Sequence, residues 1–292
     1  MSGSATHKQC IGCNSTALNT VNGYHKVALL KCTDCSLVFC TAIPTTQELT
    51  EYYKHYGKTD FISAITTKRY NTWLDEFEKF RHTNNLLDIG CGNGFFLSEA
   101  KKRRWNVYGT EFSNALVQGC VDNGINMHEG VLTEETFGGV IFDVVTSIEV
   151  IEHINNPLDE MQMVNGMLRS GGLFYCTTPN WNALSRFWLK DQYNIIAYPE
   201  HLAYFTPRSL NKLMKRCGFE KLKTETTGIS ITRFNQSTGR KKQAVVSVSS
   251  DDEVLRNKLE TKWYLKLIKK LMNAVFKFTG TGYSLKGWYV NK

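Results

Sequence analysis

A twelve-residue segment in the first third of the chain, Leu86 to Leu97, constrains the fold most. It opens with a short apolar run that is typical of a buried parallel strand. Three glycines at alternate positions follow and predict a turn, because a residue without a Cβ lets the backbone pass close under a ligand. Residues 95–102 then have a helical pattern. A strand, a glycine turn and a helix predict the start of a doubly wound α/β sheet, which binds ligands at the carboxyl ends of its strands.

Glu111 follows a second predicted strand, at residues 105–110, about 20 positions after the glycines. A carboxylate at this place can accept two hydrogen bonds from a ribose diol. The dinucleotide pattern G-x-G-x-x-G needs glycine where this chain has Phe95, so NAD is disfavoured as the ligand. The alternative is a glycine-rich turn with a solvated Glu111 and no ligand.

Asp88, the three glycines and Glu111 resemble motif I of the class I S-adenosylmethionine (AdoMet) methyltransferases. The resemblance implies an α/β, Rossmann-like seven-stranded, mostly parallel sheet with helices on both faces, and AdoMet as the cofactor. It also implies a set of residues that contact AdoMet: Asp88, Gly90, Gly92, Gly94, Glu111, Phe112, Val131, Leu132, Ser147 and Glu149.

Further segments narrow the resemblance. Residues 143–153, which end in Glu149-Val150-Ile151-Glu152-His153, and residues 200–219 resemble the subfamily sometimes called methyltransferase type 11/12/23. Its members include ubiquinone-pathway enzymes and sugar or polysaccharide methyltransferases. In the same region we expect a strand at 140–147, a helix ended by Gly171-Gly172 and a strand at 173–180. Residues 282–290 are expected to form the final strand.

Residues 7–40 form a separate pattern with two C-x-x-C knuckles. Their cysteines are Cys10, Cys13, Cys32 and Cys35, with 18 residues between the knuckles, a spacing that matches a zinc site. Four thiolates complete a tetrahedral site with no open position, so the predicted Zn2+ is structural. The alternative is four unrelated buried cysteines. A four-cysteine zinc-ribbon-like module joined to this core is similar to certain surface-glycan and antibiotic-pathway sugar methyltransferases.

Composition excludes some classes of protein. No run of about 18 apolar residues is present, so no transmembrane helix is expected, and residues 1–8 lack the apolar stretch of a secretory signal. Nine cysteines without an export signal favour reduced thiols or metal ligation over disulfides. We therefore expect a cytoplasmic protein, with peripheral contact at the inner membrane face as an option. The net charge of +8 suits an anionic partner, but much of it lies in the C-terminal third.

The expected domains are a zinc module at 1–43, the core with lead-in helices at 44–235, a helical insertion at 236–278 and the last strand at 279–292. Tyrosines within 52–56 are candidates for a substrate mouth. The insertion begins with a polar stretch. It continues with an apolar stripe from Leu255 to Phe278 accompanied by lysines. Residues 253–278 are predicted either to pack on the core or another copy, or to contact an anionic membrane. The oligomeric state is left open.

Methyl transfer to a hydroxyl benefits from a base that removes the proton, and imidazole suits that role near neutral pH. His201 and His153 fall after predicted strands, each preceded by a glutamate. Tyr198, Tyr204 and Phe205 around His201 suit stacking on a sugar. The sequence thus favours methylation of a hydroxyl or carbon of a sugar or glycan-linked acceptor, with His201 or His153 as the base.

Three alternatives to this function are open. A nucleic-acid methyltransferase is disfavoured because the strand at 140–147 is followed by Ile148-Glu149-Val150, without the Asn-Pro-Pro-Tyr tetrad of amino-methylating enzymes or a Pro-Cys pair. A quinone or natural-product intermediate is a second possible acceptor. A non-catalytic AdoMet-binding protein is the third alternative.

Overall fold

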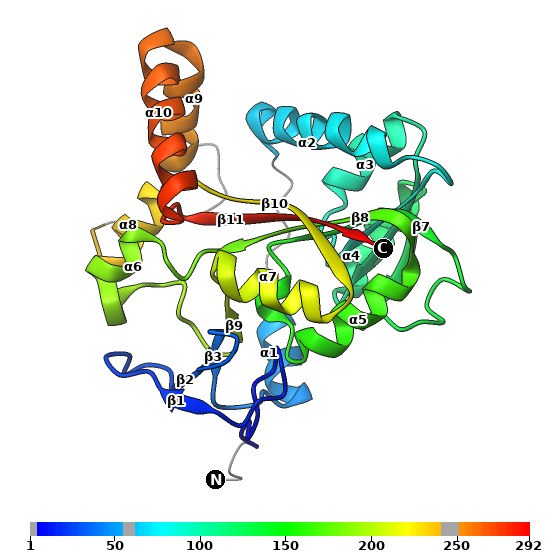
Figure 1. Cartoon of the computed structure of the whole chain (residues 1–292). Helices are drawn as coiled ribbons and strands as arrows, with labels where there is room; N and C mark the ends of the chain where they lie inside the picture. The colour runs from blue at the N-terminus through cyan, green and yellow to red at the C-terminus, as the bar shows by residue number, and fades with distance from the viewer. Residues whose placement is uncertain (1–4, 55–61, 241–250) are drawn as a thin grey trace.

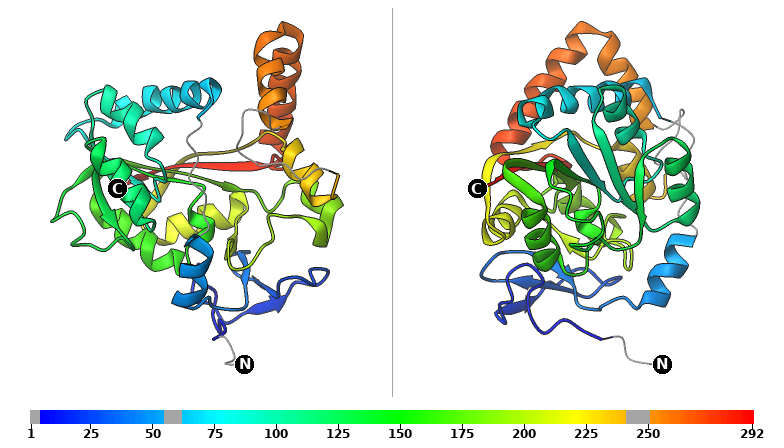
Figure 2. Two further views of the ribbon diagram at one scale, coloured as in Figure 1. Left: turned by 180° about the vertical axis from the view of Figure 1, so that it is seen from behind. Right: turned by 90° about the vertical axis from the view of Figure 1, so that its right-hand side faces the viewer.

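The computed structural model describes residues 5–54, 62–240 and 251–292. His55 and Tyr56 of the predicted substrate mouth, and residues 241–250 of the predicted insertion, lie outside this part. The chain forms one large and one small sheet, with the small sheet below the large one and a pair of helices above it (Figures 1 and 2).

The large sheet has seven strands in the order β10-β11-β8-β7-β4-β5-β6. Only β11 runs antiparallel to its neighbours, so the predicted Rossmann-like, mostly parallel fold is confirmed. In the order of the sheet the strands are β10 (Phe219–Thr227), β11 (Ser284–Asn291), β8 (Leu168–Pro179), β7 (Phe142–Ile148), β4 (Asn85–Ile89), β5 (Asn106–Glu111) and β6 (Asn126–Glu129). The strand after the glycine motif and the final strand both lie where the sequence places them.

Two hydrophobic cores cover the two faces of this sheet, because consecutive strand residues point to opposite faces. Leu86 of β4 packs with α2 (Ala64–Phe77), α3 (Phe95–Lys102) and α4 (Asn114–Asp122). Leu87 packs in the other core with α5 (Pro157–Met167) and α7 (Pro207–Arg216). Figure 1 shows α2 and α3 above the sheet and α5 and α7 below it. The remaining short elements are α1 (Thr46–Lys54), α6 (Leu184–Leu189), α8 (Ile231–Ser237) and the 3-10 turns η1 (Glu78–Phe80), η2 (Ile151–His153) and η3 (Lys190–Gln192).

The small sheet joins the N-terminal segment to the core. Its strands are β1 (Leu18–Thr20), β2 (Leu29–Cys32), β3 (Val38–Cys40) and β9 (Ala203–Tyr204), in that order. β9 comes from the core, and Val38 pairs with Tyr204. His7 Nε2 also lies 3.2 Å from Asn155 Oδ1. The domain boundary at residue 43 stays a prediction, but a sheet continues across it.

Two local predictions differ from the structure. Helix α5 ends at Met167, and Gly171-Gly172 lie inside β8, so the prediction that they end a helix is wrong. The register of β8 against β7 shifts beside Phe142, and Gly171 has a φ of +71° that suits the irregular start of the strand. The predicted amphipathic stripe is divided between two helices, α9 (Asp251–Thr261) and α10 (Trp263–Thr279). Most of the stripe on α10 is exposed, so packing on the core accounts for little of it.

Candidate active site

The glycine turn after β4 has the backbone geometry that its sequence predicts. Gly90, Gly92 and Gly94 have φ values of +64°, +55° and +66°, in the left-handed region that favours glycine. A Cβ at Gly90 would meet Val150 Cγ2 at 2.7 Å, and one at Gly94 would meet Cys120 Sγ at 2.7 Å. A Cβ at Gly92 would meet nothing within 4 Å, so the middle of the turn faces open space.

Glu111 ends the neighbouring strand and holds the turn. Its Oε2 accepts a hydrogen bond from the Gly92 amide at 3.0 Å. Its Oε1 accepts from the amides of Phe112 at 2.8 Å and Ser113 at 3.1 Å. Because β4 and β5 pair in parallel, Ile89 beside Thr110, the turn and Glu111 leave the sheet at the same edge. The structure therefore brings together the two parts of the sequence motif.

The other residues expected to contact AdoMet differ in how far their side chains are exposed. Phe112 and Val131 are exposed, whereas Leu132 and Ser147 are buried, and the Ser147 hydroxyl has no hydrogen-bond partner in the described part of the chain. Glu149 follows β7 with a φ of +57°, unusual for a residue with a side chain. Asp88 is buried and accepts a hydrogen bond from Thr146 Oγ1 at 2.6 Å. Burial raises the pKa of Asp88 to about 7.

His153 and His201 lie side by side, although 48 positions separate them in the sequence. Their ring centroids are 4.9 Å apart. The Nδ1 of His153 lies 2.5 Å from the Glu200 carbonyl oxygen, and the Nδ1 of His201 lies 2.5 Å from the Ile195 carbonyl oxygen. A carbonyl oxygen only accepts, so each Nδ1 carries the proton and donates it. Each neutral ring therefore presents an unprotonated Nε2.

Glu152 completes this group, which we call the Glu–His–His cluster (Glu152, His153 and His201). One ligand atom from each of these residues lies within 4.8 Å of the others, and Glu152 Oε1 is 3.8 Å from His153 Nε2. Glu152 is buried, and its Oε2 has no hydrogen-bond partner among residues 5–54, 62–240 and 251–292. Burial, and then the nearby Glu149 charge, raise the pKa of Glu152 well above its usual value. A buried carboxyl group of this kind stays protonated unless a cation accompanies it, and the nearby Arg233 charge acts to lower its pKa.

Burial also determines how the two histidines can act. It lowers the pKa of His153 and lowers the pKa of His201 to about 3. A base with so low a pKa is poorly matched to a hydroxyl near pH 7, whereas a metal ligand must be unprotonated there. Tyr204 and Phe205 are buried as well, and Tyr204 packs against Trp181 at 5.4 Å between ring centroids. These rings do not offer the stacking surface for a sugar that their positions in the sequence suggest.

Sequence reasoning placed both histidines at the carboxyl edge of the large sheet but missed Glu152 as their partner. The available signal was the spacing of Glu149, Glu152 and His153, which puts two carboxylates and an imidazole next to a strand end. His201 reaches the cluster only through the tertiary fold. The Leu202 amide donates to the Glu152 carbonyl oxygen at 2.8 Å and fixes the two segments together.

The four cysteines of the N-terminal segment converge as a second cluster, the four-cysteine cluster (Cys10, Cys13, Cys32 and Cys35). The Sγ atoms of Cys10 and Cys35 are 3.4 Å apart, and those of Cys13 and Cys32 are 3.6 Å apart. Amides of Gly12 and Cys35 donate to two of the sulfurs. The hydrogen bond between Cys10 and Cys35 lowers the pKa of Cys35 and raises the pKa of Cys10.

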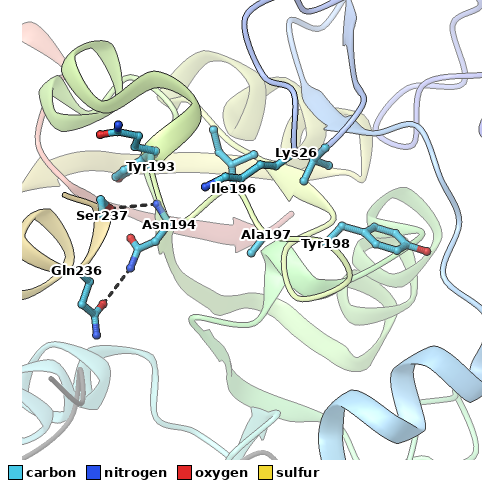
Figure 3. Close-up of a pocket in the computed structure, with 10 residues that line it drawn as sticks. Lys26, Tyr193, Asn194, Ile196, Ala197, Tyr198, Gln236 and Ser237 are labelled. Atoms are coloured by element: carbon cyan, nitrogen blue, oxygen red, sulfur yellow. Dashed lines mark hydrogen bonds between the residues drawn. The ribbon is translucent and has the colours of Figure 1, made fainter. Parts of the chain in front are cut away.

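A cavity of 390 Å³ lies elsewhere, between the N-terminal segment, the chain after α6 and α8 (Figure 3). Its lining includes Lys26, Asn194 and Gln236, and Asn194 Nδ2 donates to Gln236 Oε1 at 2.9 Å. None of the residues expected to contact AdoMet lines it. None of the residues of the Glu–His–His cluster lines it either, although the segment at 192–198 also carries the Ile195 carbonyl that accepts from His201.

Comparison with known proteins agrees with this geometry. A family model described as a methyltransferase domain matches residues 57–224, more than half of the chain. A ubiquinone biosynthesis O-methyltransferase of Roseobacter denitrificans is 26% identical over 53% of this chain and 62% of its own length. One of Haemophilus ducreyi is 28% identical over 44% of this chain and 57% of its own length. The matches to these two curated relatives thus span less than two thirds of their length.

A solved structure of a SAM-dependent methyltransferase from Archaeoglobus fulgidus superimposes with a TM-score of 0.52 at 17% identity. It covers 85% of this chain and all of the other, which supports the fold alone. The family match covers the glycine turn, Glu111 and all three residues of the Glu–His–His cluster. The chain therefore belongs to the methyltransferase-domain family, within the class I AdoMet-dependent methyltransferases.

Proposed function

We propose that the protein transfers the methyl group of AdoMet to a hydroxyl of a small-molecule acceptor. The turn at Gly90, Gly92 and Gly94 and the carboxylate of Glu111 hold the cofactor, with Asp88, Phe112, Val131, Leu132, Ser147 and Glu149 around it. The observation that carries this proposal is the contact between Glu111 and the Gly92 amide, because it joins both motif halves at one edge of the sheet. Binding of AdoMet measured by calorimetry tests it, with Glu111→Ala as the variant.

In the reaction the acceptor oxygen attacks the methyl carbon of the sulfonium, and the carbon–sulfur bond breaks. The products are a methyl ether, S-adenosylhomocysteine and a proton that passes to water. The sulfonium is already a strong electrophile, so the protein mainly aligns the two reactants. The remaining task is to make a hydroxyl more nucleophilic at neutral pH.

The Glu–His–His cluster is the group in the described part of the chain best suited to that task. Two unprotonated imidazole nitrogens and one carboxylate are ligands for Mn2+, Fe2+ or Zn2+. Each imidazole donates its other N–H to a backbone carbonyl, the arrangement common among histidines that bind metals. Ligand atoms on one such ion, at about 2.1 Å each, are at most about 4.2 Å apart, and Glu152 Oε1 and His153 Nε2 already meet this limit. A bound cation lowers the pKa of a coordinated hydroxyl.

We therefore propose that Glu152, His153 and His201 hold a divalent cation with positions left open for the acceptor. This role replaces the general-base role for His201, which stays a prediction and which burial counts against. Removal of divalent cations by a chelator, under conditions that leave the proposed structural zinc in place, followed by addition of Mn2+, tests the proposal. Activity with labelled AdoMet should be lost and then return, whereas AdoMet affinity should not change.

The names of the curated relatives favour a phenolic hydroxyl, such as that of a quinone precursor. The sugar or glycan acceptor has weaker support, because Tyr204 and Phe205 are buried. A paired screen with labelled AdoMet, using simple diphenols in one arm and nucleotide sugars in the other, separates the two. Methylation of sugars alone would overturn the phenolic assignment.

For the four-cysteine cluster we propose one structural Zn2+. Four converging sulfurs leave no position for a substrate, and the cluster adjoins the small sheet, where Cys32 ends β2, rather than a strand of the large sheet. Metal analysis of the purified protein after expression with zinc tests this assignment.

A further inference from the structure

Helix α10 carries an unusually large exposed apolar surface. Six of its exposed apolar side chains follow the helical repeat and share one side of the helix: Tyr264, Leu267, Ile268, Leu271, Val275 and Phe278. Leu271 is 60% exposed and Phe278 is 94% exposed. Trp263 at the start of the helix is 77% exposed. Scattered exposed apolar residues are ordinary, but a continuous stripe of this length marks an interaction surface.

The helix stands out from the rest of the molecule together with α9, as Figures 1 and 2 show from three sides. Its C-terminal end is fixed to the core. Phe276 is buried, its carbonyl accepts from Thr226 Oγ1 at 2.5 Å, and Asn273 Oδ1 accepts from the Gly228 amide at 3.0 Å. Lys277 pairs with Glu225 at 2.9 Å. The apolar stripe therefore projects from a firmly held base.

The charge on this helix is of one sign. Residues 263–279 contain four lysines and no acidic residue. Lys262, just before the helix, and Lys266 and Lys270 on it are four positions apart and exposed, so they form a row on the side roughly opposite the apolar stripe. A helix with an apolar side and a lysine-rich side fits the boundary between the acyl chains and the head groups of an anionic bilayer.

We propose that α10 docks this protein on an anionic phospholipid membrane. Its apolar stripe would enter the acyl boundary and its lysine row would meet the head groups. No helix in the described part of the chain is long and apolar enough to cross a bilayer. In this proposal α10 therefore lies on the membrane surface. A second copy of the chain is a poorer occupant, because it would cover the apolar stripe but leave the lysines without an anionic partner.

The orientation also suits catalysis. Helix α10 is followed by β11, whose first residue, Ser284, pairs with Pro179 at the end of β8. The helix thus rises from the edge of the sheet that carries the glycine turn. Docking through α10 would place the candidate active site close to the membrane surface, where an apolar acceptor is concentrated. This last point alone rests on the proposed phenolic acceptor.

Flotation of the full chain with vesicles tests the proposal. We expect the wild type to float with vesicles of phosphatidylcholine and phosphatidylglycerol, and to float poorly with phosphatidylcholine alone. Leu267→Glu with Leu271→Glu should abolish flotation. Lys266→Gln with Lys270→Gln should weaken binding about fivefold per lysine, an effect that falls as salt is raised.

Matched controls keep folding apart from docking. Val121→Glu on α4 adds a charge at another exposed apolar position, and Lys215→Gln on α7 removes an exposed lysine elsewhere. Both should float as the wild type does, and all variants should keep the AdoMet affinity of the wild type. Failure of the wild type to float, or unchanged flotation of Leu267→Glu with Leu271→Glu, would overturn the proposal. A dimer that this double variant dissociates, without any vesicle binding, would assign the stripe to a second copy instead.

Discussion

The two clusters of possible metal ligands differ in the way that separates a structural site from a reactive one. The four-cysteine cluster offers four soft sulfurs, lies in the small sheet and would close around its metal. The Glu–His–His cluster offers only three harder ligands at the reactive edge of the large sheet. Three protein ligands leave a place for an acceptor oxygen, and four do not. The number of ligands and the place in the fold thus indicate function before any metal is identified.

Loss of Cys32, a proposed zinc ligand, should have the largest effect. Structural zinc contributes about 10–16 kcal/mol in small zinc-binding peptides, so Cys32→Ser should lose the metal and unfold the N-terminal module. Hydrogen exchange should reveal faster exchange in β2 and β3, and also in β9, which pairs with β3. Cys217→Ser, a buried thiol outside the cluster, should keep the zinc. A wild type without zinc, after expression in zinc-supplied medium, would refute the assignment.

Glu152→Gln should come next. It keeps the size of the side chain but removes the charge that holds a cation, so turnover should fall about a hundredfold or more. AdoMet affinity should stay the same, because Glu152 is not part of the cofactor site. Single-turnover kinetics with labelled AdoMet measures both quantities. Glu160→Gln on α5, another glutamate whose pKa burial raises, to about 7, is the matched control. Near-normal turnover of Glu152→Gln would remove the cluster from the mechanism.

His201→Asn separates the two roles open to that histidine. If His201 is a ligand, both the bound cation and the activity should fall by about tenfold or more. If it is only a base, activity should fall while the cation stays bound. Manganese binding measured beside turnover distinguishes these results, and retention of full manganese affinity would contradict our assignment.

Glu111→Ala tests the cofactor site independently of both clusters. The loss of a charged acceptor should weaken AdoMet binding by about 1–3 kcal/mol, roughly 5-fold to 150-fold in Kd. Glu129→Ala is the matched control, because Glu129 ends the adjacent strand and pairs with Glu111 in the sheet. Calorimetry should find the control unchanged, and equal affinities for all three proteins would exclude Glu111 from the site.

Substitutions in the glycine turn should have the smallest effects, and they distinguish a loss of stability from a loss of cofactor binding. Gly90→Ala puts a Cβ against Val150 in a left-handed conformation, so we expect a loss of about 1–2 kcal/mol in the free energy of unfolding, or more. Gly92→Ala meets no atom within 4 Å and should lose less stability, but its Cβ enters the space proposed for the cofactor. Denaturant unfolding and calorimetry together check this split. Equal stability of the two variants would contradict the geometry.

Much of this structure was predictable because its signals are local. The strand, glycine turn and helix at 85–102 follow from apolar pattern and glycine spacing, and the cysteine cluster follows from two short knuckles. The local sequence pattern gave the wrong prediction where pairing with another strand determines the structure. Gly171 and Gly172 look like a helix end, but β7 pairs with residues just before and after them and holds them in β8. Periodicity finds the apolar stripe of α10 but does not tell whether anything covers it.

The Glu–His–His cluster in the candidate active site was also only partly predictable from the sequence. Glu152 and His153 are neighbours in the sequence, but His201 arrives from a distant segment positioned by the amide of Leu202 and the carbonyl of Ile195. The sequence predicts that each histidine follows a strand of the sheet. It does not predict that the two rings gather at one buried carboxyl group, nor that burial lowers the pKa of His201 to about 3.

The most direct test of this account counts the Mn2+ bound by zinc-loaded protein, using electron paramagnetic resonance. If zinc fills the four cysteines as proposed, manganese should report only on the nitrogen and oxygen ligands. We predict one bound Mn2+ per chain in the wild type and in Glu160→Gln, and none in Glu152→Gln. A wild type that binds no Mn2+, or a Glu152→Gln variant that binds as much as the wild type, would contradict the proposal that the Glu–His–His cluster is an open metal site.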